Sequence, residues 1–245
     1  MKSDSRLVII LLVCVFSIRP LLAQTSYDYS FAKIPGTKGF LQLSDNEGSN
    51  IKSAGEPGVN GTPMLSNIWL IGTIHFQSGE TVKDSAINYS LYSKKLYKKQ
   101  DNYFFEIVQP IVSISFVDPD EKTNGGMRLF KTGYPNIEAN TNKSLYEVLF
   151  EGENLELLLW QQKRVIEINN YGKPNEKEYE LLEKQYIYFP QKKKIEQISI
   201  SSISNLKKSL PIYADAIQNY TSSHKVNLKN KEQLTGLLNY LDKVN

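Results

Sequence analysis

The sequence predicts an α+β protein: a predominantly antiparallel β domain of about nine or ten strands, followed by a short C-terminal helical segment. Apolar and polar side chains alternate through short runs that turn-forming residues separate, which is typical of β-hairpins. No helical pattern of crossover length lies between the runs, which argues against parallel βαβ units. The chain has 245 residues, 40% hydrophobic and 11% aromatic. This composition supports a sizeable core and excludes global disorder.

Residues 1–23 are predicted to be a cleaved secretory signal peptide. A basic start is followed by an apolar run over residues 7–16 and by Ala23 before the polar Gln24. The run is too short to span a bilayer comfortably, although an uncleaved anchor is the alternative. No later stretch approaches membrane length, so we expect no transmembrane span in the mature chain. The protein is therefore expected to be exported to the periplasm, or alternatively to the extracellular space.

Cleavage changes the charge and the redox chemistry of the chain. The only cysteine, Cys14, would be removed, which leaves no disulfide and favours a bacterial periplasmic protein. Loss of Lys2, Arg6 and Arg19 together with Asp4 removes three positive charges and one negative charge, so the formal net charge falls from +3 to +1. A nearly neutral exported protein is not expected to bind nucleic acid.

The β domain is expected over residues 64–200. Before it, residues 24–63 read as an irregular segment rich in glycine and proline, which a short strand near Phe40–Leu43 could interrupt. The alternating runs that predict strands are 68–76, 87–91, 103–107, 112–116, 127–131, 145–150, 155–168, 179–189 and 195–200. Lysines at 94–95, 98–99 and 192–194 are predicted to lie in solvated turns, with weak membrane-surface contact as an alternative role.

Residues 201–245 are expected to form helices packed on the β domain. The clearest helix has leucines at i, i+3, i+4 and i+7, an apolar stripe as wide as a core-facing one; these are Leu234, Leu237, Leu238 and Leu241. Asn230 and Gln233 resemble a capping box at its start. Gly236 weakens this helix by up to about 1 kcal/mol relative to alanine, so docking on the domain is more necessary.

Several of these features occur in a recognisable order. The signal ends in Ala-Gln; residues 61–65 read Gly-Thr-Pro-Met-Leu; residues 69–72, a Ser-Gly turn at 78–79 and residues 87–92 follow; and a helical tail ends near residues 237–242. In this order the chain resembles a group of uncharacterised exported β-rich proteins of Bacteroidota-type bacteria. The resemblance spans most of the mature chain and implies an envelope location and a strand-rich fold. It supplies no catalytic residues.

No motif for catalysis, a cofactor or a metal stands out. Walker A and dinucleotide-binding glycine patterns are absent, and His75 and His224 lie in different elements without zinc-ligand spacing. The acidic residues Asp118, Asp120 and Glu121 do not match a calcium loop and are predicted to form a solvated turn. We therefore expect no cofactor, no metal site and no catalytic residues.

Four glutamates leave a hydrolase as an alternative function. They are Glu151, Glu153, Glu156 and Glu167. Paired carboxylates could serve a glycan-directed hydrolase if the fold brought two of them into one cleft. They are expected instead to flank a hairpin turn and its exposed face.

Aromatic residues are the most unusual part of the composition, with 15 tyrosines and 10 phenylalanines. They are expected to fill a sheet core, although a curved sheet could use them to line an apolar cavity. The candidate ligand- or partner-facing residues are Trp69, His75, Tyr89, Tyr103, Tyr186 and Tyr188.

The main functional hypothesis is a non-enzymatic binding or interaction protein that meets another envelope protein. Alternatives are a carrier of a lipid or other apolar small molecule, and the glycan-directed hydrolase.

Overall fold

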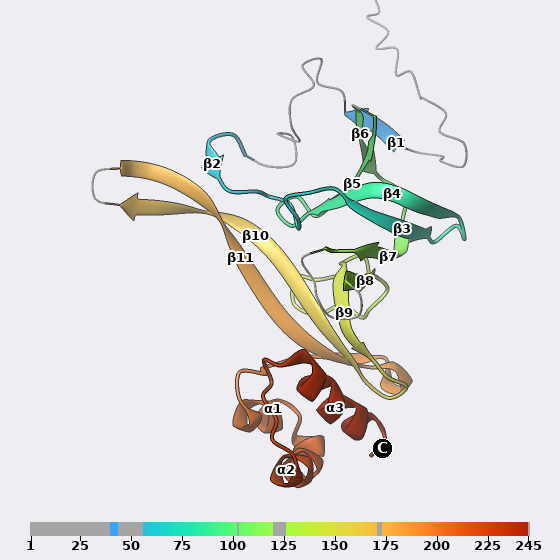
Figure 1. The fold of residues 1–245 in the computed structure, drawn as a ribbon, viewed down its shortest axis with the longest axis vertical. Coiled ribbons are helices and arrows are strands. Elements are labelled where there is room, and N and C mark those ends of the chain that lie inside the picture. The colour runs from blue at the N-terminus through green and yellow to red at the C-terminus, as the bar shows by residue number, and fades with distance from the viewer. Residues whose placement is uncertain (1–39, 44–55, 102, 120–125, 171–172, 245) are drawn as a thin grey trace, which may run out of the picture. The chain divides into compact units, whose positions relative to one another are not determined.

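The structure is a computed structural model that describes residues 40–43, 56–101, 103–119, 126–170 and 173–244 (Figure 1). These residues all belong to one compact unit, residues 31–245. The predicted signal peptide, its cleavage site and Cys14 lie outside the described residues. Among the described residues, no helix combines the length and the apolar character needed to cross a bilayer.

The described part of the chain contains twelve strands and three α-helices. The strands are β1 (Phe40–Leu43), β2 (Val59–Asn60), β3 (Leu70–Phe76), β4 (Thr81–Ser90), β5 (Lys95–Gln100), β6 (Tyr103–Ile107), β7 (Ile111–Val117), β8 (Met127–Lys131), β9 (Tyr146–Glu151), β10 (Glu156–Asn170), β11 (Lys173–Phe189) and β12 (Lys194–Ile198). The helices are α1 (Ile203–Ser209), α2 (Ala214–Ser223) and α3 (Lys231–Asp242), with 3₁₀ turns η3 (Pro190–Lys192) and η4 (Pro211–Tyr213).

The strands form one sheet in the order β1-β6-β5-β4-β3-β7-β8-β9-β10-β11-β12. Neighbours along this path are antiparallel, and β2 pairs in parallel with β11 beside the path. The fold is therefore mostly antiparallel β-sheet with short helices after it, which matches the α+β prediction in its coarse form. The strand count is higher than predicted, because β2 and β5 were not expected.

The lysine-rich segment at residues 95–100 is a strand, so its prediction as a turn is wrong. Leu96 and Tyr97 of β5 are buried, and β5 pairs with both β4 and β6. Lys98 is itself buried on the same side as Leu96, because the long apolar stem of lysine can pack in a core. The lysines of this segment obscured the strand pattern in the sequence. Lys94 and Lys192, in contrast, lie in turns as predicted, whereas Lys194 is the first residue of β12.

One face of β3–β8 carries a buried apolar cluster, which comprises Leu70, Ile74, Phe76, Ile87, Leu96, Phe105, Ile107, Ile114, Phe116 and Phe130. Gly72 lies in this face where β3 meets β7 closely. A Cβ atom at Gly72 would lie 2.5 Å from the carbonyl oxygen of Ser115, so the strands can approach only because the residue is glycine.

The face of the sheet that carries this cluster continues to the helices, and we call it the inner face. Strand pairing places Phe130 opposite Glu147, Glu147 opposite Leu159, Leu159 opposite Gln185, and Gln185 opposite Ile198. Directly paired residues point to the same face of a sheet. The five residues therefore form one row across β8–β12 on the inner face.

The helices cover the end of the inner face near the β9–β10 turn (Figure 1). The four leucines of α3 are buried in one cluster with residues of β9–β12, which confirms the apolar stripe predicted for this helix. Asn230 caps α3 by accepting a bond from the Gln233 backbone N–H, as predicted, but the Gln233 side chain accepts from Asn227 instead of completing the box. Gly236 provides room, because a Cβ there would lie 2.9 Å from the Tyr220 hydroxyl.

Asp242 at the end of α3 holds the β9–β10 turn. Its carboxylate accepts bonds from the backbone N–H groups of Glu153, Asn154 and Leu155 at 3.0, 2.7 and 2.9 Å. Gly152 makes room for it, because a Cβ at that position would lie 2.5 Å from the Asp242 carboxyl carbon. The turn and the last helix are thus joined by polar contacts as well as by the apolar cluster.

Lys163 joins β10 to the first half of the chain. Its backbone N–H donates to the carbonyl oxygen of Leu91 at 3.0 Å. Its ammonium donates to the carbonyl oxygens of Thr62 and Met64 at 2.9 and 2.8 Å, and burial lowers the pKa of this lysine. The turn after β4 therefore lies against β10 at Lys163, beyond residues 156–159, which pair with β9.

Candidate functional site

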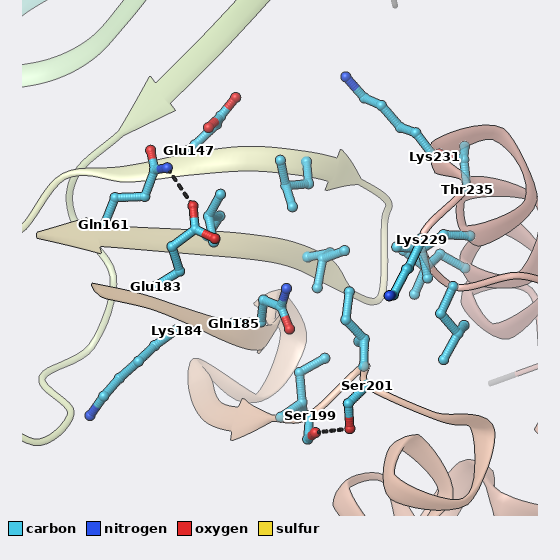
Figure 2. Close-up of a pocket in the computed structure, with 18 of the residues that line it drawn as sticks. Glu147, Gln161, Glu183, Lys184, Gln185, Ser199, Ser201, Lys229, Lys231 and Thr235 are labelled. Carbon is cyan, nitrogen blue, oxygen red and sulfur yellow. Dashed lines mark hydrogen bonds between the residues drawn. The ribbon is translucent and has the colours of Figure 1, made fainter. Parts of the chain in front are cut away.

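The candidate site is a cleft of about 770 Å³ on the inner face, between β9–β12 and the start of α3 (Figure 2). Alternation along β10 brings Leu157, Leu159 and Gln161 to the same face, so they form the floor of the cleft in sequence. A cleft of this volume lies within the range typical of small-molecule sites, about 300–1,000 Å³.

The half of the cleft nearest the helices is apolar. Leu157 is buried in the same cluster as Leu228 and Leu234, which form the wall on the helix side. Leu159 and Leu149 are only half-buried, so their side chains offer apolar surface to the cleft. This half can hold the apolar part of a ligand by removing its surface from water.

The other half of the floor is polar. Gln161 and Glu183 are paired across β10 and β11, and the Gln161 amide nitrogen donates to the Glu183 carboxylate at 2.7 Å (Figure 2). This bond fixes which way the amide is turned, because the carboxylate accepts only from the nitrogen. The Gln161 amide oxygen is consequently directed away from Glu183. It is buried and makes no hydrogen bond within the described structure.

Beside this polar floor, Arg128 binds two carboxylates. Its guanidinium donates to both oxygens of Glu147 at 2.8 and 2.7 Å and to Asp118 at 3.0 Å. The guanidinium also lies 5.7 and 5.3 Å from the ring centres of Phe116 and Phe130. Burial opposes its charge, but the bonds and charges of Glu147 and Asp118 outweigh burial and raise the pKa of Arg128.

This network corrects one prediction. Asp118 is only 9% exposed, so it does not lie in a solvated turn as predicted. Sequence patterns could not predict the ion pair of Asp118 with Arg128, because Arg128 lies on the next strand. The described contacts thus join one guanidinium to two carboxylates.

Two lysines lie at the opposite end of the cleft. Lys229 is exposed in the turn before α3, and Lys231 is the first residue of that helix. Figure 2 shows both on the helix side, with Gln161 and Glu183 on the far side of the aliphatic side chains. Lys184 also lines the far side, where it forms an ion pair with Glu138 at 2.6 Å. The cleft therefore has an apolar middle between two ends lined by charged and polar side chains.

Three predicted candidates lie in the first half of the sheet. Trp69 is half-buried and stacks on Phe104 with ring centres 5.3 Å apart. His75 is exposed, and its Nδ1 lies 3.0 Å from the Thr81 hydroxyl. Tyr89 packs against the apolar cluster of β3–β8, where burial raises the pKa of its hydroxyl. None of the three lines the cleft.

The other predicted candidates are not at the cleft either. Tyr186 and Tyr188 belong to a tyrosine cluster on the opposite face of the sheet, packed edge-to-face with Tyr146 at 5.6 Å and with Tyr134 at 5.1 Å. Tyr186 is fully buried there. The side chain of Tyr103 lies outside the described residues. Aromatic content thus indicated core packing at Tyr186, not the cleft.

The four glutamates considered for hydrolysis do not meet at the cleft. Glu156 is 9% exposed and accepts a bond from the Tyr134 hydroxyl at 2.7 Å on the face opposite the cleft, so it is not on an exposed hairpin face as predicted. Burial raises its pKa. Glu151 forms an ion pair with Lys131 at 2.6 Å, and Glu167 is exposed.

Sequence reasoning missed the cleft residues because they come from separate elements and match no motif. Only the Gln161–Glu183 pair could have been found from the sequence, since the long alternating runs on either side of the hairpin turn set its register. Within the described residues, no group of three or more histidine, cysteine, aspartate or glutamate side chains could hold a metal ion. No known protein family, curated protein or solved structure matches this chain.

Proposed function

We propose that the protein is an exported, non-enzymatic binding protein and that the cleft takes a small amphipathic molecule. The observation that carries the proposal is the open cleft itself, in which half-buried Leu149 and Leu159 lie between polar walls. Partly exposed leucines at the bottom of a concave site gain stability when a ligand covers them. The amide, carboxylate and ammonium groups around them can orient its polar parts.

The proposal keeps the envelope location that the N-terminal residues predict. It differs from a carrier with an aromatic-lined cavity, because the tyrosines around Tyr186 pack against one another and the cleft is lined by aliphatic side chains. Docking of another envelope protein on the same surface is the competing function. Mass spectrometry of the mature N-terminus tests the export: a chain that begins at Gln24 is expected, and an intact Met1 in the cytoplasm would contradict it.

Binding can be tested with N-phenyl-1-naphthylamine, an uncharged apolar molecule that fluoresces when it leaves water. The purified protein should bind it at one site. Leu159→Arg should weaken binding at least tenfold by placing a charge on the apolar floor. Thr235→Trp should do the same by filling the cleft from the α3 wall, which guards against a folding defect in the first variant.

Leu181→Arg is the matched control, because Leu181 is an exposed leucine of β11 that does not line the cleft. It should bind the probe as the unchanged protein does, and thermal unfolding should show all three variants folded. Absence of probe binding, or an equal loss in Leu181→Arg, would show that the cleft is not a ligand site.

A further inference from the structure

The longest strand, β11, has an unpaired stretch of edge between two strands that pair with it. β2 pairs with this edge at Lys177 and Glu178, and β12 pairs with it over residues 185–189. No described strand pairs with the residues between them on this side, and we call residues 179–184 the open edge of β11. At a rise of about 3.3 Å per residue, the open edge is about 20 Å long.

A hydrogen bond on the other side of the hairpin shows which backbone groups face the open edge. The N–H of Lys163 donates to Leu91, so it points away from β11, and Lys163 is paired with Leu181. In an antiparallel pair of strands, residue pairs that exchange backbone hydrogen bonds alternate with pairs that do not. Lys163 and Leu181 do not exchange them, so the N–H and C=O of Leu181 point to the open edge. The same holds two residues further on for Glu183, which is paired with Gln161.

The open edge lacks the features that usually keep a strand edge from pairing. Prolines, bulges and charged side chains serve this purpose in natural sheets. Residues 179–184 contain no proline, and β11 keeps a regular register with β10 along this stretch. Two of the three charged side chains here already form ion pairs within the chain, Glu180 with Arg164 at 2.5 Å and Lys184 with Glu138 at 2.6 Å. The edge can therefore accept a further strand.

Apolar side chains lie at the centre of the open edge on both faces of the sheet. Leu181 is 44% exposed on the inner face, and Leu182 is half-buried on the opposite face. A strand added here would place one side chain beside each leucine, because directly paired residues share a face. Apolar residues at the centre of the added strand would remove both leucines from water, which favours them over polar residues.

We infer that the open edge of β11 binds an extended segment of about five residues from a partner protein. The backbone of this segment exchanges hydrogen bonds with Leu181 and Glu183, and its central side chain covers Leu181. Addition of a strand to a sheet edge is a common mode of peptide recognition. β2 and β12 occupy the same edge on either side, so the segment leaves the sheet at both ends. The β11 strand of a second copy does not fit, because it would run on into β2 or β12.

Amide hydrogen exchange measured by NMR tests whether the edge is open in the free protein. The amides of Leu181 and Glu183 should exchange at least about tenfold faster than those of Leu182 and Lys184, which bond to β10 by the same alternation. Slow exchange at all four residues would mean that another segment of this chain covers the edge, and the inference would be wrong.

The probe for binding is the pentapeptide Thr-Thr-Ile-Thr-Thr with both ends capped, in which the isoleucine sets the register beside Leu181. It should shift the amide signals of Leu181 and Glu183 and slow their exchange. N-methylation of the isoleucine should weaken binding at least about tenfold, because in an antiparallel strand this N–H faces β11. N-methylation of the second and fourth residues should leave binding unchanged, because their N–H groups face away.

The two N-methylated peptides decide the mode of binding without any change to the protein. The opposite pattern of losses would also support strand addition, with the added strand parallel to β11. Equal binding of the two forms, or no shift at Leu181 and Glu183 at millimolar peptide, would overturn the inference.

Protein variants separate the open edge from the cleft. Leu181→Pro removes an outward N–H and no bond to β10, so it should abolish peptide binding while the naphthylamine probe still binds. Leu181→Thr keeps that N–H and should retain peptide binding. Thr235→Trp fills the cleft and should leave peptide binding unchanged, so either proposal can fail while the other stands.

Sedimentation of the free protein tests the remaining occupant, a segment of a second copy. A monomer is expected. A dimer that Leu181→Pro dissociates would show that this chain fills its own open edge, which would overturn the assignment to a partner protein.

Discussion

Asp242 offers the sharpest test of how the helices are held on the sheet. Its carboxylate accepts three backbone N–H bonds from the β9–β10 turn. Leu155 is fully buried, so its N–H cannot turn to water when the carboxylate is removed. The N–H of Glu153 is exposed and loses little. With about 1–3 kcal/mol for the buried donor and less for the partly buried Asn154, Asp242→Ala should lower the free energy of unfolding by about 2–4 kcal/mol.

Asp242→Asn gives a graded comparison. It keeps one side-chain oxygen, which can still accept from Asn154 and Leu155, and it loses only the bond to the exposed Glu153 N–H. Its loss should be about 1 kcal/mol. Gly152→Ala should approach the loss of Asp242→Ala, because the added Cβ displaces the carboxylate. The double variant should then lose much less than the sum of the two single losses.

Urea unfolding followed by circular dichroism measures these differences. Asp101→Asn, at an exposed aspartate of the β5–β6 turn, is the control and should change stability by less than about 0.5 kcal/mol. A loss below 0.5 kcal/mol in Asp242→Ala would refute the reasoning, since it would mean that the turn does not depend on this carboxylate.

Three further outcomes are expected. Leu238→Ala should cost about 2–5 kcal/mol in urea unfolding, because it empties a buried site between α3 and the sheet; an unchanged midpoint would mean that α3 is not docked. Gly236→Ala should fail to gain the roughly 1 kcal/mol of helix propensity that alanine offers, because its Cβ meets the Tyr220 hydroxyl, and Tyr220→Phe should restore much of that gain in the same assay. Burial raises the pKa of Glu156 above its ordinary 4.5, so its contribution to stability is present at low pH and is lost as pH rises through the folded pKa. Glu156→Gln should therefore gain stability relative to the unchanged protein as pH rises from about 4 to 7, and a difference that stays constant with pH would contradict this.

The elements that sequence reasoning could predict are those with an uninterrupted period. The stripe of α3 is one, because its four leucines repeat with the helix and no charged residue breaks the pattern. β5 is the opposite case. Lys98 occupies an inward position on that strand, and a residue type typical of turns masked an alternation that Leu96 begins.

The contacts that sequence reasoning could not predict join distant segments. Asp242 meets the β9–β10 turn 88 residues away at Asn154, and Asp118 meets Arg128 on the next strand. A single polar side chain has no periodicity, so nothing local distinguishes a buried partner from a solvated one. The cleft could not be predicted for the same reason. Each residue that lines it is typical of its own strand or helix, and only the register of the β10–β11 hairpin brings Gln161 opposite Glu183.

The contact of Lys163 with the first half of the chain has a consequence for the order of folding. Its ammonium meets carbonyl groups 101 and 99 residues earlier, at Thr62 and Met64. Such distant pairing raises the contact order, and sheets of this kind fold in milliseconds to seconds. A chain that emerges N-terminus first can pair β3–β8 before β9 and β10 arrive, so the edge of β8 stays open during that interval. An open strand edge can pair with other chains, so a holding chaperone present during synthesis should raise the yield of folded protein.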